Sequence, residues 1–463
     1  MKLPDAWSRA TAVFDDANLV SFAGLAPVLA VGERSGLSEL IAERVRFKTA
    51  KVRAAGVNPV GKLTSIIAGM AAGADSIDGL DAIRSGGMRQ LFTGVYACAT
   101  LGQFLREFTH GHTLQLASAA RAHLVNLVEH GYVLPGIEQR AFIDIDSLLR
   151  PVFGHQKQGA SFGFTKIAGK PVLRKGLSPL VTTIGTEPGA PVIAGIRLRA
   201  GRAGSAKGAA SMVAEAIRTA RTAGAGGEIL VRGDSAYGSS VVINACITAG
   251  ARFSFVLITT AAVAAAIAAI TEDAWMPVHY PGAVLDPDTG HLISDAEVAE
   301  IEFTAFASTK TPVTARLIVR RVRDRARLDE LFPVWRYHPF LTNSSEPTAA
   351  ADITHRRHAI IETVFADLID GPLAHLPSGQ FNANAAWVIC AAITHNLLRA
   401  AGTLAGGRHA AARGATLRRQ LITVPGRLAR PQRRRVLHLP AHWPWARHWA
   451  ALWTAATGPP AAA

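Results

Sequence analysis

Apolar residues recur three or four positions apart from about Ser21 to Glu129, in segments such as LTSIIAGMAAG and QLASAARAHLVNLVEHG. This spacing is typical of amphipathic helices that bury one face. Gly24, Gly61 and the SGG at 85–87 separate the segments, as helix-breaking residues do. The first part of the chain is therefore predicted to be a helical domain.

The period changes to two at Gln139, where AFIDIDSLL alternates apolar and acidic residues as a β-strand does. Extended runs follow at 163–186 and 191–201, and helical spacing returns at 207–223. GGEILVRGDSAYG then predicts a fourth strand that ends in a turn, and ARFSFVLIT predicts another buried strand. This order of elements predicts an α/β fold, with a mixed sheet flanked by helices.

Residues 272–335 interrupt that order with proline, turn signals and β-type runs such as EIEFTAFAS and TARLIVRRVRD. The apolar run at 253–270 fits a buried strand followed by a helix better than a membrane span. The predicted organisation is a helical domain at 1–138, an α/β domain at 139–271 and 336–400, a β-rich insertion at 272–335 and a basic tail at 401–463.

The charge of the chain indicates what kind of partner it binds. The formal net charge is +15, and from Gly371 to the end there is no Asp or Glu, while arginines accumulate, including Arg433, Arg434 and Arg435. A basic surface of this kind favours a polyanion, with nucleic acid as the first candidate. Tryptophans interleave with the basic residues, and we expect them to dock the tail onto the rest of the protein.

Three isolated cysteines, Cys98, Cys246 and Cys390, have no spacing that fits a zinc ribbon or a disulfide framework. The first residues contain acidic side chains and lack the apolar core of a signal peptide. We therefore expect a protein of the reducing cytoplasm that has no membrane partner.

Acidic residues at strand ends are the main candidates for chemistry. Asp144 and Asp146 share one face of the first predicted strand, Asp234 closes the fourth strand, and Glu362 lies in the helical segment HRRHAIIETVFADL. Chemistry on a phosphodiester can use carboxylates that hold two Mg²⁺ ions roughly 4 Å apart. Each acidic residue alone also fits an ordinary surface or turn position, so only the set is informative.

Three blocks carry a resemblance to a known family. FIDIDSLLRPVFGHQKQGASFGF, ILVRGDSAYGS and HRRHAIIETVFADLIDGPLAHLPSGQFNANAAW resemble the catalytic blocks of bacterial insertion-sequence transposases of the IS-thirteen-eighty type, and the similarity covers nearly the whole chain. The resemblance implies a ribonuclease-H-like catalytic domain with a DDE carboxylate triad. Its catalytic and metal-binding residues would be Asp146, Asp234 and Glu362, with Asp144 as the alternative to Asp146.

The sequence departs from the family pattern at several positions. Leu148 stands where the family commonly has Thr after the first aspartate. Around the glutamate, the family often has Tyr seven residues before, Arg four before and Lys seven after, whereas this chain has His355, His358 and Ile369. We predict that the neighbouring Arg356 and Arg357 supply the phosphate contacts instead.

The resemblance implies a mechanism in which the element's terminus is hydrolysed with two bound Mg²⁺ ions, or Mn²⁺ in their place, and the freed 3′-hydroxyl attacks target DNA. The partner would be double-stranded DNA, bound by the N-terminal helices and by Arg433, Arg434 and Arg435, with a homodimer pairing two ends. Tyr237, close to Asp234, is expected to pack rather than to act as a nucleophile. A nuclease of the same fold that cuts without joining, and a domesticated DNA-binding protein without catalysis, are the alternatives.

Overall fold

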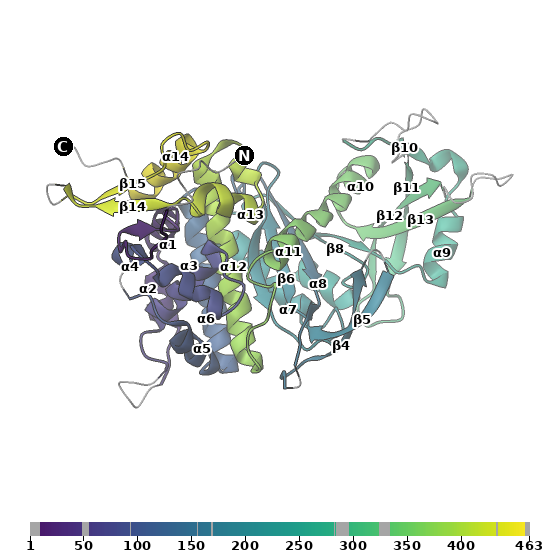
Figure 1. The fold of residues 1–463 in the computed structure, drawn as a ribbon. Helices are drawn as coiled ribbons and strands as arrows, with labels where there is room; N and C mark the ends of the chain where they lie inside the picture. Colours follow the sequence, from purple (N-terminus) through teal and green to yellow (C-terminus); the bar gives the residue numbers. More distant parts are fainter. Residues whose placement is uncertain are drawn as a thin grey trace.

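The computed structural model describes residues 10–48, 55–92, 94–154, 156–167, 170–281, 283, 296–323, 334–431 and 434–458. Figure 1 shows a bundle of N-terminal helices at one end of the molecule, a large sheet in the middle and a further group of strands at the other end. The N-terminal helices are α1 (Leu25–Arg34), α2 (Leu37–Arg44), α3 (Pro59–Ala72), α4 (Met88–Leu91), α5 (Cys98–Arg106) and α6 (His110–Glu129).

Residues that favour the start of a helix stand at the beginning of α3 and α6. Asn58 accepts a hydrogen bond from the backbone N–H of Gly61, and Pro59 takes the first helical position of α3. A capping box of Thr109 and His112 opens α6. The prediction of a helical N-terminal part is confirmed.

One later helix runs through the N-terminal bundle. Helix α12 (Phe381–Ala405) packs against α1, α3, α5 and α6 and also contacts strand β7 (Val192–Arg197). Among the described residues, it alone is long and apolar enough to cross a membrane, but 89% of its apolar window is buried within the protein. Helix α12 therefore serves as the core of the bundle.

The described strands of the large sheet have the order β10-β11-β12-β13-β9-β8-β2-β6-β7. Strand β2 is parallel to β8, and β8 is parallel to β9, whereas β6 is antiparallel to both β2 and β7. The mixed α/β architecture predicted from the sequence is confirmed. The remaining bounds are β2 (Arg140–Ser147), β6 (Leu180–Gly185), β8 (Glu228–Gly233), β9 (Arg252–Val256), β10 (Met276–Val278), β11 (Ala296–Ala305), β12 (Val313–Arg323) and β13 (Trp335–Thr342).

Helices cover this sheet in the way its apolar strands require. Helix α7 (Ala209–Thr222) contacts β2, β6 and β7, α8 (Ser240–Thr248) contacts α7 and β9, and α11 (Ile361–Ile369) contacts β2. The apolar run at 253–270 forms β9 and then helix α9 (Ala261–Ala268), as predicted.

The β-type runs of residues 272–335 form strands that lengthen the large sheet. Strand β13 pairs antiparallel with β9, with Phe340 opposite Val256, and β12, β11 and β10 continue outward from it. Helix α10 (Thr348–Arg356) contacts β10, β11 and β12. The insertion is thus continuous with the sheet, and its domain boundaries stay predictions.

Two smaller three-stranded sheets complete the described fold. Strands β3 (Arg150–Pro151), β4 (Ser161–Ile167) and β5 (Lys170–Leu177) form one, and β1 (Leu19–Val20), β14 (Gly426–Ala429) and β15 (Val436–His438) form the other. The second sheet joins the two ends of the chain. The last described helix, α14 (Ala446–Thr457), contacts α1 and α12, and its Trp449 is buried, so this part of the tail docks onto the bundle.

Candidate active site

Two aspartates lie side by side at one edge of the large sheet. In the parallel pair of β2 and β8, Ile145 is opposite Gly233, so that the next residues, Asp146 and Asp234, are at the same level. Neighbouring strands are about 4.8 Å apart. Both side chains are half-buried, so two carboxylates meet at the carboxyl edge of adjacent parallel strands.

Backbone geometry holds both carboxylates. The N–H of Ser147 donates to Oδ1 of Asp146 at 2.6 Å, and the N–H of Ala236 donates to Oδ1 of Asp234 at 2.9 Å. Gly233 is needed for the close packing here, because a β-carbon at that position would lie 2.9 Å from Cε1 of Phe255. The glycine beside the aspartate therefore serves strand packing as well as the turn.

A buried tyrosine and a buried arginine lie behind the two aspartates. Burial, together with the charges of Asp146 and Asp234, raises the pKa of the Tyr237 hydroxyl. Burial lowers the pKa of Arg199, while Tyr237 and the carboxylate of Asp146 act to raise it. Tyr237 is therefore protonated at neutral pH, and Arg199 places a positive charge close to Asp146. The sequence analysis did not single out Arg199.

Asp144 forms a buried ion pair with Arg232. Its carboxylate accepts two hydrogen bonds from Arg232, at 2.7 and 2.9 Å, and the two side chains are 2% and 3% exposed. Arg232 also donates to the carbonyl oxygen of Thr354 at 2.8 Å and lies over the ring of Phe142. Asp144 therefore links β2 to β8 and to helix α10.

Glu362 lies in the first turn of α11, where its side chain is exposed. Ile361, Val364 and Leu368 are buried on the same helix, which contacts β2. Glu362 is thus an exposed carboxylate on a helix that packs against β2, the strand that carries Asp146.

The far half of α11 is fixed by the C-terminal segment. Asp367 is buried and accepts hydrogen bonds from Nε of Arg413 and, at 3.0 Å, from the N–H of Gly414. Arg399 of α12 lies 3.8 Å from the same carboxylate. These contacts hold the helix that bears Glu362 against α12 and the C-terminal segment.

The two histidines that depart from the family pattern near Glu362 contact other parts of the protein, whereas Ile369 is exposed. His355 is buried, its Nδ1 lies 2.8 Å from Oγ of Ser254, and its ring stacks on Phe340. Burial lowers the pKa of His355 well below its usual value, so the ring is neutral at pH 7. His358 contacts the carbonyl oxygen of His355 through Nδ1. His355 therefore offers no positive charge to a phosphate at neutral pH.

The two arginines predicted to replace those contacts are exposed. Arg356 stacks on the ring of Tyr280, with 3.8 Å between its Cζ and the ring centre. Arg357 forms an ion pair with Glu187 at 3.7 Å. Their role in contacting phosphate stays a prediction.

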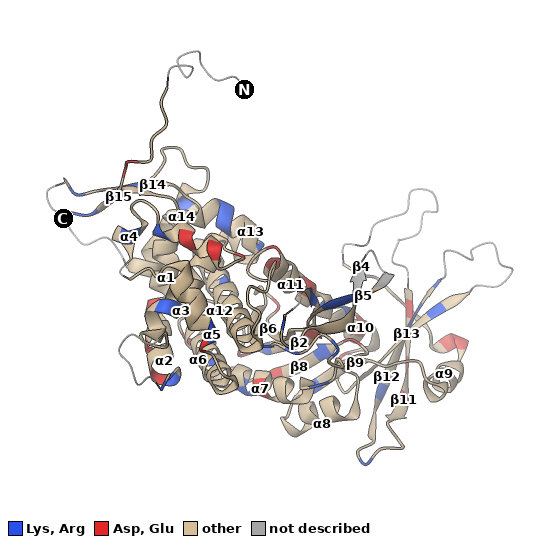
Figure 2. Cartoon of the chain, turned by 60° about the horizontal axis from the view of Figure 1, so that its bottom comes forward, with Lys and Arg blue, Asp and Glu red and all other residues tan. Residues whose placement is uncertain are grey.

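The basic C-terminal segment divides into structural and exposed arginines. Arg399, Arg413 and Arg418 contact the end of α11, and Arg427 pairs with Asp16. Arg418 and Arg419 lie in the π-helix (Arg418–Ile422) that follows α13 (Gly414–Leu417), and Arg427 lies in β14; Figure 2 shows blue residues beside the α13 and β14 labels. Arg434 and Arg435 are exposed, and Arg433 lies outside the described residues.

Replacing both Arg434 and Arg435 with glutamine is expected to weaken DNA binding more at low salt than at high salt. Each lost phosphate contact reduces the salt slope of log K by about 0.9, so the double variant loses up to about 1.8. Fluorescence anisotropy over a salt titration measures this slope. Arg323→Gln, an exposed change at the end of β12, is the matched control. An unchanged slope in the double variant would remove these two residues from the DNA interface.

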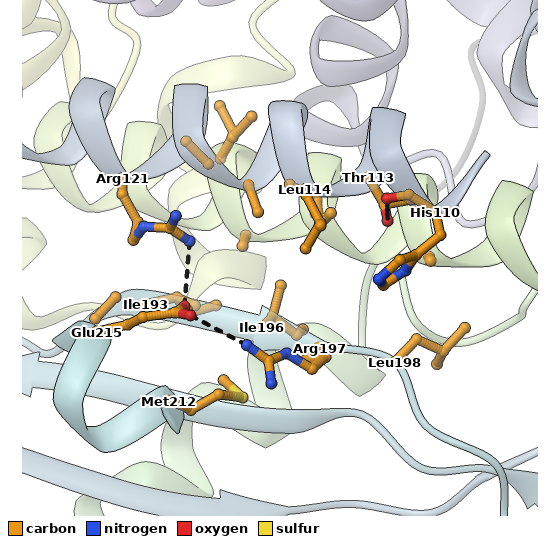
Figure 3. Close-up of a pocket in the computed structure, with 18 of the residues that line it drawn as sticks. His110, Thr113, Leu114, Arg121, Ile193, Ile196, Arg197, Leu198, Met212 and Glu215 are labelled. Atoms are coloured by element: carbon orange, nitrogen blue, oxygen red, sulfur yellow. Dashed lines mark hydrogen bonds and ion pairs between the residues drawn. The ribbon is translucent and has the colours of Figure 1, made fainter. Parts of the chain in front are cut away.

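A separate cavity of about 200 Å³ lies between α6, β7, α7 and α12 (Figure 3). At its rim, Glu215 accepts from Arg121 at 3.4 Å and from Arg197 at 3.2 Å. Much of the remaining lining is apolar, including Ile193 and Ile196. Its charges are already paired with each other, so the cavity offers weaker candidates for catalysis than the acidic sheet edge.

The donors at that edge fit a divalent cation. Mg²⁺ prefers carboxylate oxygens and retains several waters, so few protein ligands are enough. Asp146 and Asp234 provide two such ligands at neighbouring strand ends. Within the ranges described, no three His, Cys, Asp or Glu side chains lie together as a group that could hold a metal ion, so the structure does not bring Glu362 together with Asp146 and Asp234.

These features define an α/β protein of strongly basic charge whose carboxylates meet at the end of adjacent parallel strands. Residues 4–456 match the family model described as transposase DDE domain group 1. The chain belongs to this family of transposases, for which DNA is the partner and divalent metal ions are the general requirement. A comparison with curated proteins finds no match.

Proposed function

We propose that this transposase cleaves DNA at the ends of an insertion sequence and joins the freed 3′-hydroxyls to target DNA. The observation that carries the proposal is the pair of carboxylates, Asp146 and Asp234, level with each other on adjacent parallel strands. A phosphodiester held at that edge would meet both side chains. We also propose that it is of the IS-thirteen-eighty type, which the three sequence blocks resemble.

The topology supports a ribonuclease-H-like catalytic domain. In the resembling family, the first Asp lies on the first strand, the second beside the fourth, and the Glu on a later helix. Here β2 carries Asp146, β8 is the fourth strand of the large sheet in chain order, and α11 carries Glu362. The proposed assignment of these three residues follows the same order.

Asp146 is the better choice for the first ligand because Asp144 is already neutralised. The buried bidentate pair with Arg232 occupies both oxygens of Asp144. Moving that carboxylate to a metal would leave the guanidinium of Arg232 buried without its partner, which is strongly unfavourable. Asp146 is half-buried at the strand end, where substrate can reach it.

Asp146, Asp234 and Glu362 would hold the two ions that this chemistry needs. Two bound Mg²⁺ ions supply activation of the attacking oxygen and stabilisation of the charge on the phosphate. The chain's own residues set the electrostatics of the edge: Arg199 offsets part of the negative charge of Asp146, and Tyr237 stays protonated behind it. A protonated, buried Tyr237 is unsuited to form a covalent link to DNA, which supports direct transfer between phosphodiesters.

The test is a cleavage and joining assay with the full chain. A labelled duplex carrying the inverted repeat that borders the gene is incubated with a supercoiled target plasmid and Mg²⁺. We expect a cleaved end and a labelled plasmid, both lost with excess EDTA and restored by added Mg²⁺ or Mn²⁺. Labelled plasmid formed in EDTA would contradict the carboxylate mechanism.

The same assay separates the alternative functions. Cleavage without labelled plasmid would indicate a nuclease that does not join. Binding without cleavage under any divalent ion would indicate a DNA-binding protein that has lost catalysis. Only cleavage followed by joining supports the proposed function.

A further inference from the structure

A hairpin projects from the chain directly after the strand of Asp146. Strands β4 and β5, with the short β3, form a separate sheet between β2 and β6 along the chain. The N–H of Leu148 donates to the carbonyl oxygen of Pro179 at 3.1 Å, which closes the base of this segment. The β4–β5 hairpin is therefore rooted at the acidic edge of the large sheet.

Glycines fix one face of the hairpin against the protein. A β-carbon at Gly163 would lie 2.3 Å from the carbonyl oxygen of Gly201, and one at Gly201 would lie 2.2 Å from that of Ser161. A β-carbon at Gly176 would lie 2.4 Å from the carbonyl oxygen of Arg150. Backbones this close leave no room for a β-carbon. The glycine face of the hairpin therefore packs directly against the backbone of residues 150 and 201.

The opposite face of the hairpin carries exposed apolar side chains. Phe162 and Phe164 are two residues apart and so share a face, and they are 61% and 75% exposed. Leu173 is opposite Phe164 and is 53% exposed, and Lys175 is opposite Phe162. Burying such side chains is favourable, so their shared exposure indicates a surface that contacts a partner.

The charge of the segment identifies the partner's chemistry. From Ser147 to Thr186 the sequence has six Lys or Arg residues and no Asp or Glu. Arg150 and Lys157 donate to backbone carbonyls of residues 374–378, whereas Lys175 is opposite Phe162 and so lies on the aromatic face. Flat apolar rings with basic neighbours suit a polyanion that also presents flat apolar groups.

We propose that Phe162 and Phe164 stack on unpaired nucleobases at the end of the DNA that is cut beside Asp146, while Lys175 on the same face contacts its phosphates. This inference rests on the proposed function, since the DNA end must lie at the acidic edge. It adds a base-binding surface that the carboxylates do not require. Stacking needs bases that have left the duplex, so the surface distinguishes an opened end from paired DNA.

The experiment compares two 40-base-pair probes that carry the bordering inverted repeat. In one, the last three nucleotides of a strand are unpaired and contain 2-aminopurine, and in the other, the end is fully paired. The full-length double variant Phe162→Ala with Phe164→Ala is expected to bind the unpaired probe about tenfold or more weakly, and the paired probe within about twofold of wild type. Wild type should quench the 2-aminopurine, and the double variant should not.

Two controls make the result specific. Phe162→Tyr with Phe164→Tyr keeps aromatic rings and should restore both tight binding and quenching. Met276→Ala removes an exposed apolar side chain from β10 at the far end of the sheet and should leave both unchanged.

Three outcomes would overturn the inference. If wild type cleaves the probe while the alanine variant matches it in affinity and quenching, the hairpin does not bind bases and the proposed function stands. If the alanine variant instead loses binding to phosphatidylglycerol vesicles with DNA binding intact, the partner is a membrane. If wild type neither binds nor cleaves either probe, the proposed function fails and the inference fails with it.

Discussion

Asp234→Asn is expected to reduce cleavage of element ends by about 10³-fold or more while the protein still folds and binds DNA. Asparagine has nearly the same shape, and its side-chain oxygen can still accept the hydrogen bond that the N–H of Ala236 gives to Asp234. It lacks the negative charge that a divalent ion requires. Single-turnover cleavage with Mg²⁺ measures the loss, and anisotropy checks binding.

Asp146→Asn and Glu362→Gln are expected to behave alike, because the three carboxylates act on the same step. Two isosteric changes elsewhere are the controls: Asp273→Asn in the short 3-10 helix before β10 and Glu302→Gln on the exposed side of β11. Both should cleave at the wild-type rate. If Glu362→Gln cleaved normally while the aspartate variants failed, the third ligand would have to be sought on another element.

Asp144→Ala is expected to lower the free energy of unfolding by about 3–5 kcal/mol, the usual cost of leaving one member of a buried ion pair alone. Arg232 is 3% exposed and would lose the carboxylate that neutralises it, keeping its bond to the carbonyl of Thr354 and its contact with the ring of Phe142. Urea unfolding followed by circular dichroism measures the change.

Asp146→Ala is the matched control for that experiment, since it removes the same side chain two residues further along β2. We expect its stability to fall by less than that of Asp144→Ala, because Asp146 is only half-buried and the buried Arg199 close to it keeps its hydrogen bonds to Ser178 and to backbone carbonyls. Replacing Arg232 with Met in the Asp144→Ala background should restore part of the loss, because the buried charge is then gone. Equal stability of the two aspartate variants would show that the ion pair contributes little.

The sequence was informative where local pattern determines structure. Alternation in AFIDIDS predicted β2, and the Gly and Asp at the end of ILVRGD predicted where β8 ends. Helical spacing predicted the N-terminal bundle and α11. The strand order could not be read from pattern alone, because the pairing of β2 with β8 joins residues that are far apart in the chain.

The partner of Asp144 had a signal that the sequence analysis did not use. Arg232 precedes Asp234 by two residues, as Asp144 precedes Asp146, so aligning the two aspartates on parallel strands also aligns Asp144 with Arg232. The hairpin face was harder to foresee. Phe162 and Phe164 alternate with small residues as core positions of a strand do, and only their exposure separates them from a buried pair.

Helix α12 has a consequence for how such proteins diversify. Its side chains fill the centre of the N-terminal bundle, while its Asn396 donates to the carbonyl oxygen of Ile193 and accepts from its N–H, closing the free edge of β7. The helical half therefore cannot be exchanged between related transposases as a module, because its core comes from the other half of the chain.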